Sequence, residues 1–190
     1  AATTIAAMSH LFALHGAPLV IKSDNGPAFK SADWFELLTR WRVTRLLSPP
    51  YAPWYNGSCE RGIGAMRART AFFAERNGHP GHWTRADLDD AVRQANRLHR
   101  TEERPQATAE QLWEARALIS AEDRAEFSRA LEARHIALEE NDAPARHGAR
   151  RRAKLEREAV RQALEERGLL QVTRRSVPLP LKVKKVANIT

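Results

Sequence analysis

The chain has 190 residues, of which 43% are hydrophobic, with one cysteine and a formal net charge of +8. That length suits one domain with appendages, and the apolar content excludes wholesale disorder. The apolar runs are far shorter than the ~20 residues of a membrane-spanning helix, and a single thiol excludes an internal disulfide framework. The first residues lack the pattern of a secretory signal, so the expected location is the cytoplasm.

Positive charge is concentrated in the last quarter of the chain. Residues 146–190 hold 13 Lys and Arg against 4 Asp and Glu, whereas residues 1–145 hold 18 against 19. A basic segment of this kind favours a polyanion as its partner, and nucleic acid is the expected one. The alternative is a basic tail that is only solvated, and charge alone does not decide between the two.

The N-terminal part of the chain predicts a helix followed by a short buried strand. Residues 1–15 have helical character, and Gly16 and Pro18 end that helix. Residues 19–21, Leu-Val-Ile, are apolar without alternation, which is typical of a strand buried on both faces in a parallel or mixed sheet. Asp24 follows at the C-terminal end of that strand, within a Ser-Asp-Asn-Gly sequence.

A second helix and strand and a proline-rich loop come next. Ser31 is a good N-cap for a helix, and residues 43–47 suit another short strand. The apolar residues of the predicted helix cover one broad face: Trp34, Phe35, Leu37, Leu38 and Trp41. Residues 48–58 hold three prolines and an Asn-Gly pair, so they form a loop, and residues 58–76 predict a helix.

The second half of the chain is predicted to be mainly helical. Three Ser or Thr residues stand three positions before an acid or amide, which is the capping-box pattern at a helix start. These pairs are Thr84 with Asp87, Thr108 with Gln111, and Ser120 with Asp123. After a break at 141–148, residues 149–167 predict a basic amphipathic helix, and the remaining tail is expected to be extended.

Two carboxylates stand where a metal site can form. Asp24 ends the buried strand, Glu60 lies in the first turn of the helix after the proline-rich loop, and 35 residues separate them. Both can converge at the sheet edge where ligands collect in open α/β folds, and carboxylate oxygens suit Mg²⁺. The alternatives are a turn residue, since Asn25 and Gly26 tolerate positive φ, and an acid that complements the helix dipole.

The sequences around both carboxylates resemble the catalytic core of retroviral-type integrases and the related bacterial insertion-sequence transposases. In that family the second Asp lies in S-D-N-G-x-x-F, and a Glu 35 residues on lies in S-P-x-x-P-x-x-N-G-x-x-E-R. Both contexts occur here, as Ser23-Asp24-Asn25-Gly26 with Phe29, and as Ser48-Pro49, Pro53, Asn56-Gly57 and Glu60-Arg61. Asn96 and Arg104-Pro105 resemble a segment that closes many bacterial cores, although Gln106 replaces its His. The resemblance covers residues 1–117.

The resemblance implies an RNase H-like α/β fold with a D,D-35-E metal triad that cleaves DNA and transfers strands. Asp24 would be the second triad ligand and Glu60 the third, both holding Mg²⁺ or Mn²⁺. In the family the first Asp lies on an upstream strand, and the 23 residues before Asp24 contain no Asp or Glu. We therefore expect the first ligand and the opening strands to be absent from this chain, with weak metal binding as a consequence.

The same resemblance indicates where DNA would be contacted. Arg67 comes two helical turns after Glu60 and shares its face, where a cation would meet phosphate; an ordinary surface Arg is the alternative. Tyr51 either stacks on DNA or packs its loop against the protein. The expected DNA contacts are Tyr51, Asn56, Arg61, Arg67, Arg151, Arg152, Arg174, Arg175, Lys184 and Lys185.

Along the chain we expect a partial integrase core at 1–117, a helical linker at 118–148, and a basic helix with an extended tail at 149–190. The fold class is α/β. The expected function is DNA integration or transposition by a DDE-type recombinase, with DNA and further copies of the chain as partners and no membrane. The alternative is a non-catalytic DNA-binding or oligomerisation remnant of a transposase. A bacterial, nucleoid-associated location fits both functions, and whether this chain is itself an enzyme stays open.

Overall fold

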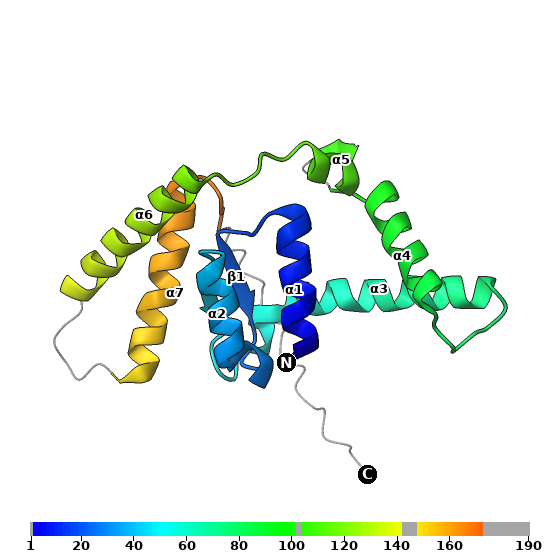
Figure 1. Ribbon diagram of the computed structural model, residues 1–190, viewed down its shortest axis with the longest axis horizontal. Coiled ribbons are helices and arrows are strands. Elements are labelled where there is room, and N and C mark those ends of the chain that lie inside the picture. Colours follow the sequence, from blue (N-terminus) through cyan, green and yellow to red (C-terminus); the bar gives the residue numbers. More distant parts are fainter. Residues whose placement is uncertain (1, 102–103, 142–147, 173–190) are drawn as a thin grey trace, which may run out of the picture.

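The structure, a computed structural model, describes residues 2–101, 104–141 and 148–172 (Figure 1). Within these residues the fold is mixed α/β, mostly helical with few strands, and the expected fold class is confirmed. We distinguish a core unit, residues 2–56 and 121–166, from an arm, residues 57–114, which leaves the core unit through one long helix. Over the described residues, none of the helices is long and apolar enough to cross a lipid bilayer.

A two-stranded parallel sheet lies at the centre of the core unit. β1 (Val20–Ser23) pairs with β2 (Thr44–Leu47), and the register runs without a shift from their first residues to their last. Parallel strands need a crossover connection, which is provided by the 3₁₀ helix Pro27–Lys30 and by α2 (Ala32–Arg40). The parallel pairing expected from the apolar run before Asp24 is confirmed.

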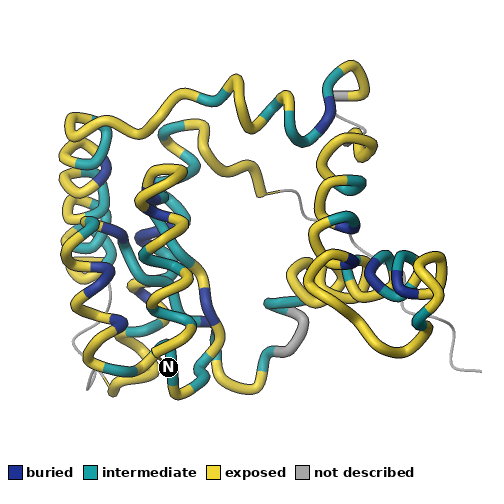
Figure 2. The backbone as a smooth tube through the Cα atoms, turned by 45° about the vertical axis from the view of Figure 1, so that its right-hand side comes forward, coloured by how far each residue is buried: buried dark blue, intermediate teal, exposed yellow. Residues whose placement is uncertain are grey.

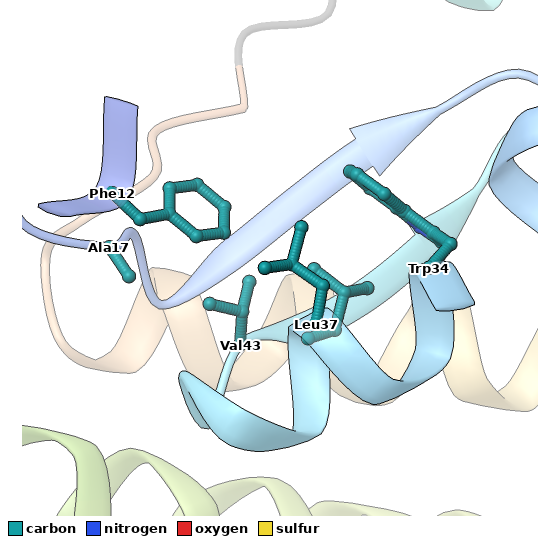
Figure 3. Close-up of a cluster of buried hydrophobic side chains, with 6 residues drawn as sticks. Phe12, Ala17, Trp34, Leu37 and Val43 are labelled. Carbon is teal, nitrogen blue, oxygen red and sulfur yellow. The ribbon is translucent and has the colours of Figure 1, made fainter. Parts of the chain in front are cut away.

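Helices α1 (Ala2–His15) and α2 pack on one side of the sheet and form a hydrophobic core with it (Figure 3). The core side chains are Phe12, Ala17, Trp34, Leu37, Leu38 and Val43. Phe29 lies edge-on to Trp34, with 5.2 Å between ring centres, which ties the turn after β1 to α2. Phe35 was expected on the buried face but is 41% exposed, because it lies off the 34–37–38–41 stripe; the Arg45 guanidinium covers its ring at 4.0 Å.

Helices α6 (Ala121–Glu140) and α7 (Ala149–Glu166) lie side by side and cover the other side of the sheet (Figure 1). α7 packs against β2, and in Figure 3 its orange ribbon passes behind the strands, opposite α2. The buried side chains of this pair are Phe127, Leu155, Ala159, Val160 and Ala163. The predicted amphipathic helix is confirmed, and its apolar stripe contributes to the covering of the sheet. The domain boundaries at 118 and 149 stay predictions.

One arginine joins α6 to the segments that lead into both strands. The Arg124 guanidinium donates hydrogen bonds to the carbonyls of Ala17, Pro18 (3.0 Å) and Arg42 (3.4 Å). Burial lowers the pKa of Arg124, and the three carbonyls replace the water that the guanidinium loses. The α6–α7 pair is therefore held to the sheet by hydrogen bonds as well as by apolar packing.

The arm is a pair of helices with a small appended sheet. α3 (Gly57–Arg76) packs against α4 (Arg85–Leu98). β3 (Arg100–Thr101) and β4 (Arg104–Thr108) form an antiparallel pair that the sequence did not indicate, and α5 (Ala109–Glu114) follows. The buried residues of the helix pair are Thr70, Ala74, Asp87 and Ala91. Figure 2 shows that most of the arm is exposed, with a few buried segments along α3 and α4, and that more buried segments lie in the core unit.

Candidate functional site

Asp24 directly follows β1, at the carboxyl end of the sheet, and its side chain is exposed. Its Oδ1 accepts a hydrogen bond from the Gly26 amide at 2.8 Å. Gly26 has φ −60° and ψ 153°, an ordinary extended conformation. The turn therefore does not use the positive φ that glycine tolerates. A Cβ at residue 26 would lie 2.9 Å from the same Oδ1, so glycine permits the close approach of the Asp24 carboxylate.

Glu60 lies in the first turn of α3, where a negative charge interacts favourably with the helix dipole. The 3₁₀ helix Pro53–Asn56 runs directly into α3, so the end of the proline-rich loop and the first turn of the helix are continuous. The Glu60 side chain is exposed, and within the described residues it has no hydrogen-bond or ion-pair partner. It is therefore available for a ligand.

Hydrogen bonds through one serine join the segments that carry the two carboxylates. Asn25 Nδ2 donates to the Ser48 carbonyl at 2.8 Å. The Ser48 hydroxyl lies 3.0 Å from the Ser23 carbonyl and 2.7 Å from Oδ1 of Asn56, and it donates its single proton to one of them. Ser23 and Ser48 are buried, where hydrogen bonds are strengthened by the low dielectric. Asn56 precedes Glu60 by one helical turn, so this Ser48 network links the end of β1 to the start of α3.

Lys22 adds a link that sequence reasoning missed. Its Nζ donates to the Tyr55 carbonyl at 2.5 Å and lies 4.3 Å from the centre of the Tyr55 ring. Lys22 belongs to β1 and Tyr55 precedes α3 by two residues, so the ammonium holds the loop against the strand. No sequence signal distinguished it from a solvent-facing lysine, because its partner is a backbone carbonyl 33 positions away.

Oxygen ligands for a divalent cation are present in part. Within the described residues, no group of three or more His, Cys, Asp or Glu side chains is placed to hold a metal ion. Two carboxylates, completed by water and a substrate phosphate, are nevertheless a donor set that Mg²⁺ accepts. That Asp24 and Glu60 hold one cation together stays a prediction.

The expected DNA contacts near the two motifs are all at the surface or partly exposed. Tyr51 is 92% exposed with φ 59°, so its ring does not pack the loop against the protein. Asn56 is engaged by Ser48, and Arg61 Nη2 lies 3.4 Å from the Ser58 hydroxyl. Arg67 is exposed on α3. The contact role of these residues stays a prediction.

The expected contacts in the C-terminal segment divide into two groups. Arg151 and Arg152 are exposed in the first turn of α7. That turn contains no acidic residue, so its charge is uniformly positive. The other four residues lie outside the described part of the chain: Arg174, Arg175, Lys184 and Lys185.

Comparison with known proteins agrees with the two motifs. A stretch of 64 residues is 39% identical to the Gag-Pro-Pol polyprotein of human T-cell leukemia virus 2; it covers 34% of this chain and 4% of the polyprotein. A chain of the simian T-cell lymphotropic virus intasome, solved in complex with PP2A regulatory subunit B56 gamma, matches with a TM-score of 0.54 and 26% identity, over 62% of this chain and 41% of that chain. The similarity is to retroviral integrases. No family model matches the chain.

A further solved structure is the catalytic core domain of HTLV-2 integrase in complex with magnesium, in a dimeric form. It matches with a TM-score of 0.47 and 24% identity, over 59% of this chain and 68% of that domain. This chain thus spans less than half the length of the intasome chain and a small part of the polyprotein. The matches to the polyprotein and to the intasome chain support a retroviral-type integrase core, and neither points specifically to bacterial transposases.

Proposed function

We propose that this chain is part of the core of a D,D-35-E recombinase, which breaks and joins DNA phosphodiester bonds during integration or transposition. The Ser48 network carries the proposal, because it joins the S-D-N-G segment to the segment that leads into Glu60. Ser48 directly follows β2, so the pairing of β1 with β2 brings the two motifs to the same end of the sheet. The similarity to retroviral integrases supports the same function.

Asp24 and Glu60 are the residues that would hold Mg²⁺ or Mn²⁺. When bound, such a cation supplies activation of the attacking oxygen and stabilisation of charge at the phosphate. The residues of the chain itself supply positioning: the Gly26 amide orients the Asp24 carboxylate, and Ser48 and Lys22 hold the start of α3 against β1. Preorganisation of this kind reduces the rearrangement needed at the moment of reaction. With two carboxylates, metal affinity is expected to be weak.

A second function is favoured by the number of acidic ligands. The motifs supply two of the three triad carboxylates, and within the described residues no group of three or more His, Cys, Asp or Glu side chains is placed to hold a metal ion. A chain with this site would bind DNA, or further copies of itself, without phosphoryl transfer. The two functions differ in whether bound DNA is cleaved when Mn²⁺ is added.

The metal site can be tested by measuring Mn²⁺ binding through the loss of the free-ion EPR signal. We expect Asp24→Asn and Glu60→Gln each to lower Mn²⁺ affinity at least about tenfold, since even outer-shell changes have effects of that size. The matched controls are Asp33→Asn and Glu75→Gln, which change exposed acids elsewhere on the surface. Equal affinity in all four variants and the unchanged chain contradicts the metal site.

Nicking of supercoiled plasmid in Mn²⁺ distinguishes the two functions. Nicking that Asp24→Asn abolishes supports the recombinase. If both Asp24→Asn and Glu60→Gln still nick the plasmid, other residues carry the activity and the proposal is wrong. DNA binding without any nicking supports the non-catalytic function.

The first turn of α7 is the surface that we propose for contact with the DNA backbone. It carries three arginines in a row, Arg150 to Arg152, and its N-cap, Gly148, provides no side-chain cap. Cations at a helix N-terminus interact unfavourably with the helix dipole, and a phosphate placed there compensates both the dipole and the side-chain charges. The arrangement therefore destabilises the free helix slightly and favours a polyanion.

This surface must be tested by neutralising charge, because deleting α7 would also uncover the sheet. We expect the triple change Arg150→Gln, Arg151→Gln and Arg152→Gln to weaken duplex binding and to reduce the slope of log affinity against log salt by about 0.9 for each lost phosphate contact. Arg40→Gln, on α2, is the control. An unchanged salt slope in the triple variant would contradict the contact.

A further inference from the structure

A shallow pocket of about 460 Å³ lies between α3 and the start of α4, and we call it the arm pocket. Its lining combines apolar, aromatic and cationic side chains: Ile63, Met66, Arg67, Trp83, Arg85 and Leu88. Trp83, which comes just before α4, is 51% exposed, and Ile63 and Leu88 are also exposed. The pocket therefore presents a half-uncovered indole ring on an apolar floor, with two guanidinium groups in its lining.

The polar groups of the arm pocket indicate an anionic ligand. Arg67 and Arg85 contribute its charges, and the Arg85 side chain is 86% exposed although it pairs with Asp89 at 3.0 Å. The lining contains no acidic side chain. A ligand with a flat apolar ring and flanking negative charges matches this combination, and a nucleotide is such a ligand.

The arm pocket lies on the same face of α3 as Glu60. Glu60, Ile63, Arg67 and Thr70 follow at helical spacing, and the last three line the pocket. At 1.5 Å per residue, Arg67 is about 10 Å along the helix from Glu60. That distance corresponds to about three nucleotides at the 3.4 Å rise of a stacked strand.

We propose that the arm pocket binds an unpaired base of the DNA strand whose phosphodiester lies at Asp24 and Glu60. The base stacks on Trp83, and Arg67 and Arg85 contact the phosphates on either side of it. An unpaired base is required because the faces of bases within a duplex are covered by their neighbours, whereas frayed or single-stranded ends offer a free face to an aromatic side chain. The inference rests on the proposed function, since it assumes that the chain acts on DNA.

The experiment compares two fluorescent DNA probes by anisotropy: a blunt 20-base-pair duplex and the same duplex with a three-nucleotide unpaired 3′ extension. We expect the extension to strengthen binding about tenfold, the effect of one stacked base. Trp83→Ala should remove that advantage, and Trp83→Tyr, which keeps an aromatic ring, should retain most of it. Trp113→Ala is the matched control, because Trp113 is 50% exposed but lies on α5, outside the arm pocket.

The outcomes separate this inference from the proposed function. If the unchanged chain binds both probes equally, or if Trp83→Ala keeps the advantage of the extension, the unpaired-base site is wrong while DNA binding stands. If Trp83→Ala and Trp113→Ala lose the advantage together, the effect is not specific to the arm pocket and the inference fails. If the unchanged chain binds neither probe, the proposed function fails as well. Helical circular dichroism at 222 nm confirms that each variant is folded.

Discussion

The core unit and the arm are stabilised in different ways. The core unit buries large apolar side chains, among them Trp34, Phe127 and Val160, on both sides of its sheet. The helix pair of the arm buries small or polar residues, of which Asp87 is fully covered. The arm leaves larger apolar side chains exposed: Ile63, Phe72, Trp83, Leu88 and Val92. The comparison indicates that the core unit is held mainly by apolar packing, and that the arm relies more on hydrogen bonds and leaves apolar side chains exposed.

The candidate site lies where these two regions meet. Asp24 belongs to the core unit and Glu60 to the first turn of the arm. Their relative position depends on the Ser48 network and on the bond from Lys22 to Tyr55, since the helix that carries Glu60 leaves the core unit immediately afterwards. The predictions below test this division of roles, from the largest expected effect to the smallest.

The first prediction compares two phenylalanines. Phe127→Ala, at a site only 2% exposed on α6, should lower the free energy of unfolding by about 3–5 kcal/mol, because it leaves a cavity in the core unit. Phe72→Ala, at a site 52% exposed on α3, should change it by no more than about 0.5 kcal/mol. Urea denaturation followed by tryptophan fluorescence measures both. Comparable losses in the two variants would mean that the arm is as tightly packed as the core unit.

The second prediction concerns the attachment of α6 to the sheet. Arg124→Met keeps the aliphatic stem but leaves the carbonyls of Ala17, Pro18 and Arg42 without their donor, so we expect a loss of about 1–3 kcal/mol. Arg129→Met, at an exposed position of the same helix, is the control and should be nearly neutral. The same urea titration applies. A neutral Arg124→Met would show that apolar packing alone holds α6 in place.

Local features were predictable from the sequence, and contacts between distant segments were not. All three capping boxes form as predicted, at Thr84, Thr108 and Ser120, because each depends on residues three positions apart. The amphipathic stripe of α7 was predicted, but its partner, β2, lies more than 100 residues earlier and leaves no mark in the periodicity. The bonds of Arg124 were missed for the same reason.

The candidate site shows the same limit. The residues Asp24 and Glu60 followed from motif context and spacing, whereas the bonds that join their segments did not. Lys22 contacts the carbonyl and the ring of Tyr55, which lies 33 positions away, and no local pattern in the sequence reveals that contact. Sequence reasoning thus named two candidate ligands and missed the bonds of Ser48 and Lys22 that join their segments.

The third prediction is a pH dependence of α4, in the arm, that depends on Asp87. Hydrogen bonds from Thr84 lower the pKa of Asp87 from its usual value of 3.8, with further lowering by Asn77 and by the charge of His79. A carboxyl with a lowered pKa in the folded state stabilises that state above its usual pKa and loses the contribution as the pH falls below it. We therefore expect the protection factors of the α4 amides, which correct for the intrinsic pH dependence of exchange, to fall below about pH 4.

The matched variants test whether Asp87 causes this change. Asp87→Asn should show low protection factors in α4 at pH 7 already, with little further change in them on acidification. Asp90→Asn, which removes an exposed acid paired with Arg93, should behave like the unchanged chain. Hydrogen exchange measured by mass spectrometry resolves α4 from the core unit. Acid sensitivity of α4 that Asp87→Asn leaves unchanged would contradict the role of Asp87.

The last prediction uses the two glycines that follow an asparagine in the motifs. Gly26→Ala is compatible with the backbone at that position, so the restriction of the unfolded chain should stabilise the protein by about 0.4–1 kcal/mol. The new methyl group, however, would lie 2.9 Å from Oδ1 of Asp24, so the carboxylate must turn away and lose its bond to the residue 26 amide, which offsets about the same amount. Net stability should hardly change, while Mn²⁺ affinity falls.

Gly57→Ala is the control. Its methyl group meets no atom within 4 Å at the first position of α3, so it should leave Mn²⁺ affinity unchanged. Equal Mn²⁺ affinity in the two variants would show that metal binding does not depend on how the Gly26 amide orients the Asp24 carboxylate.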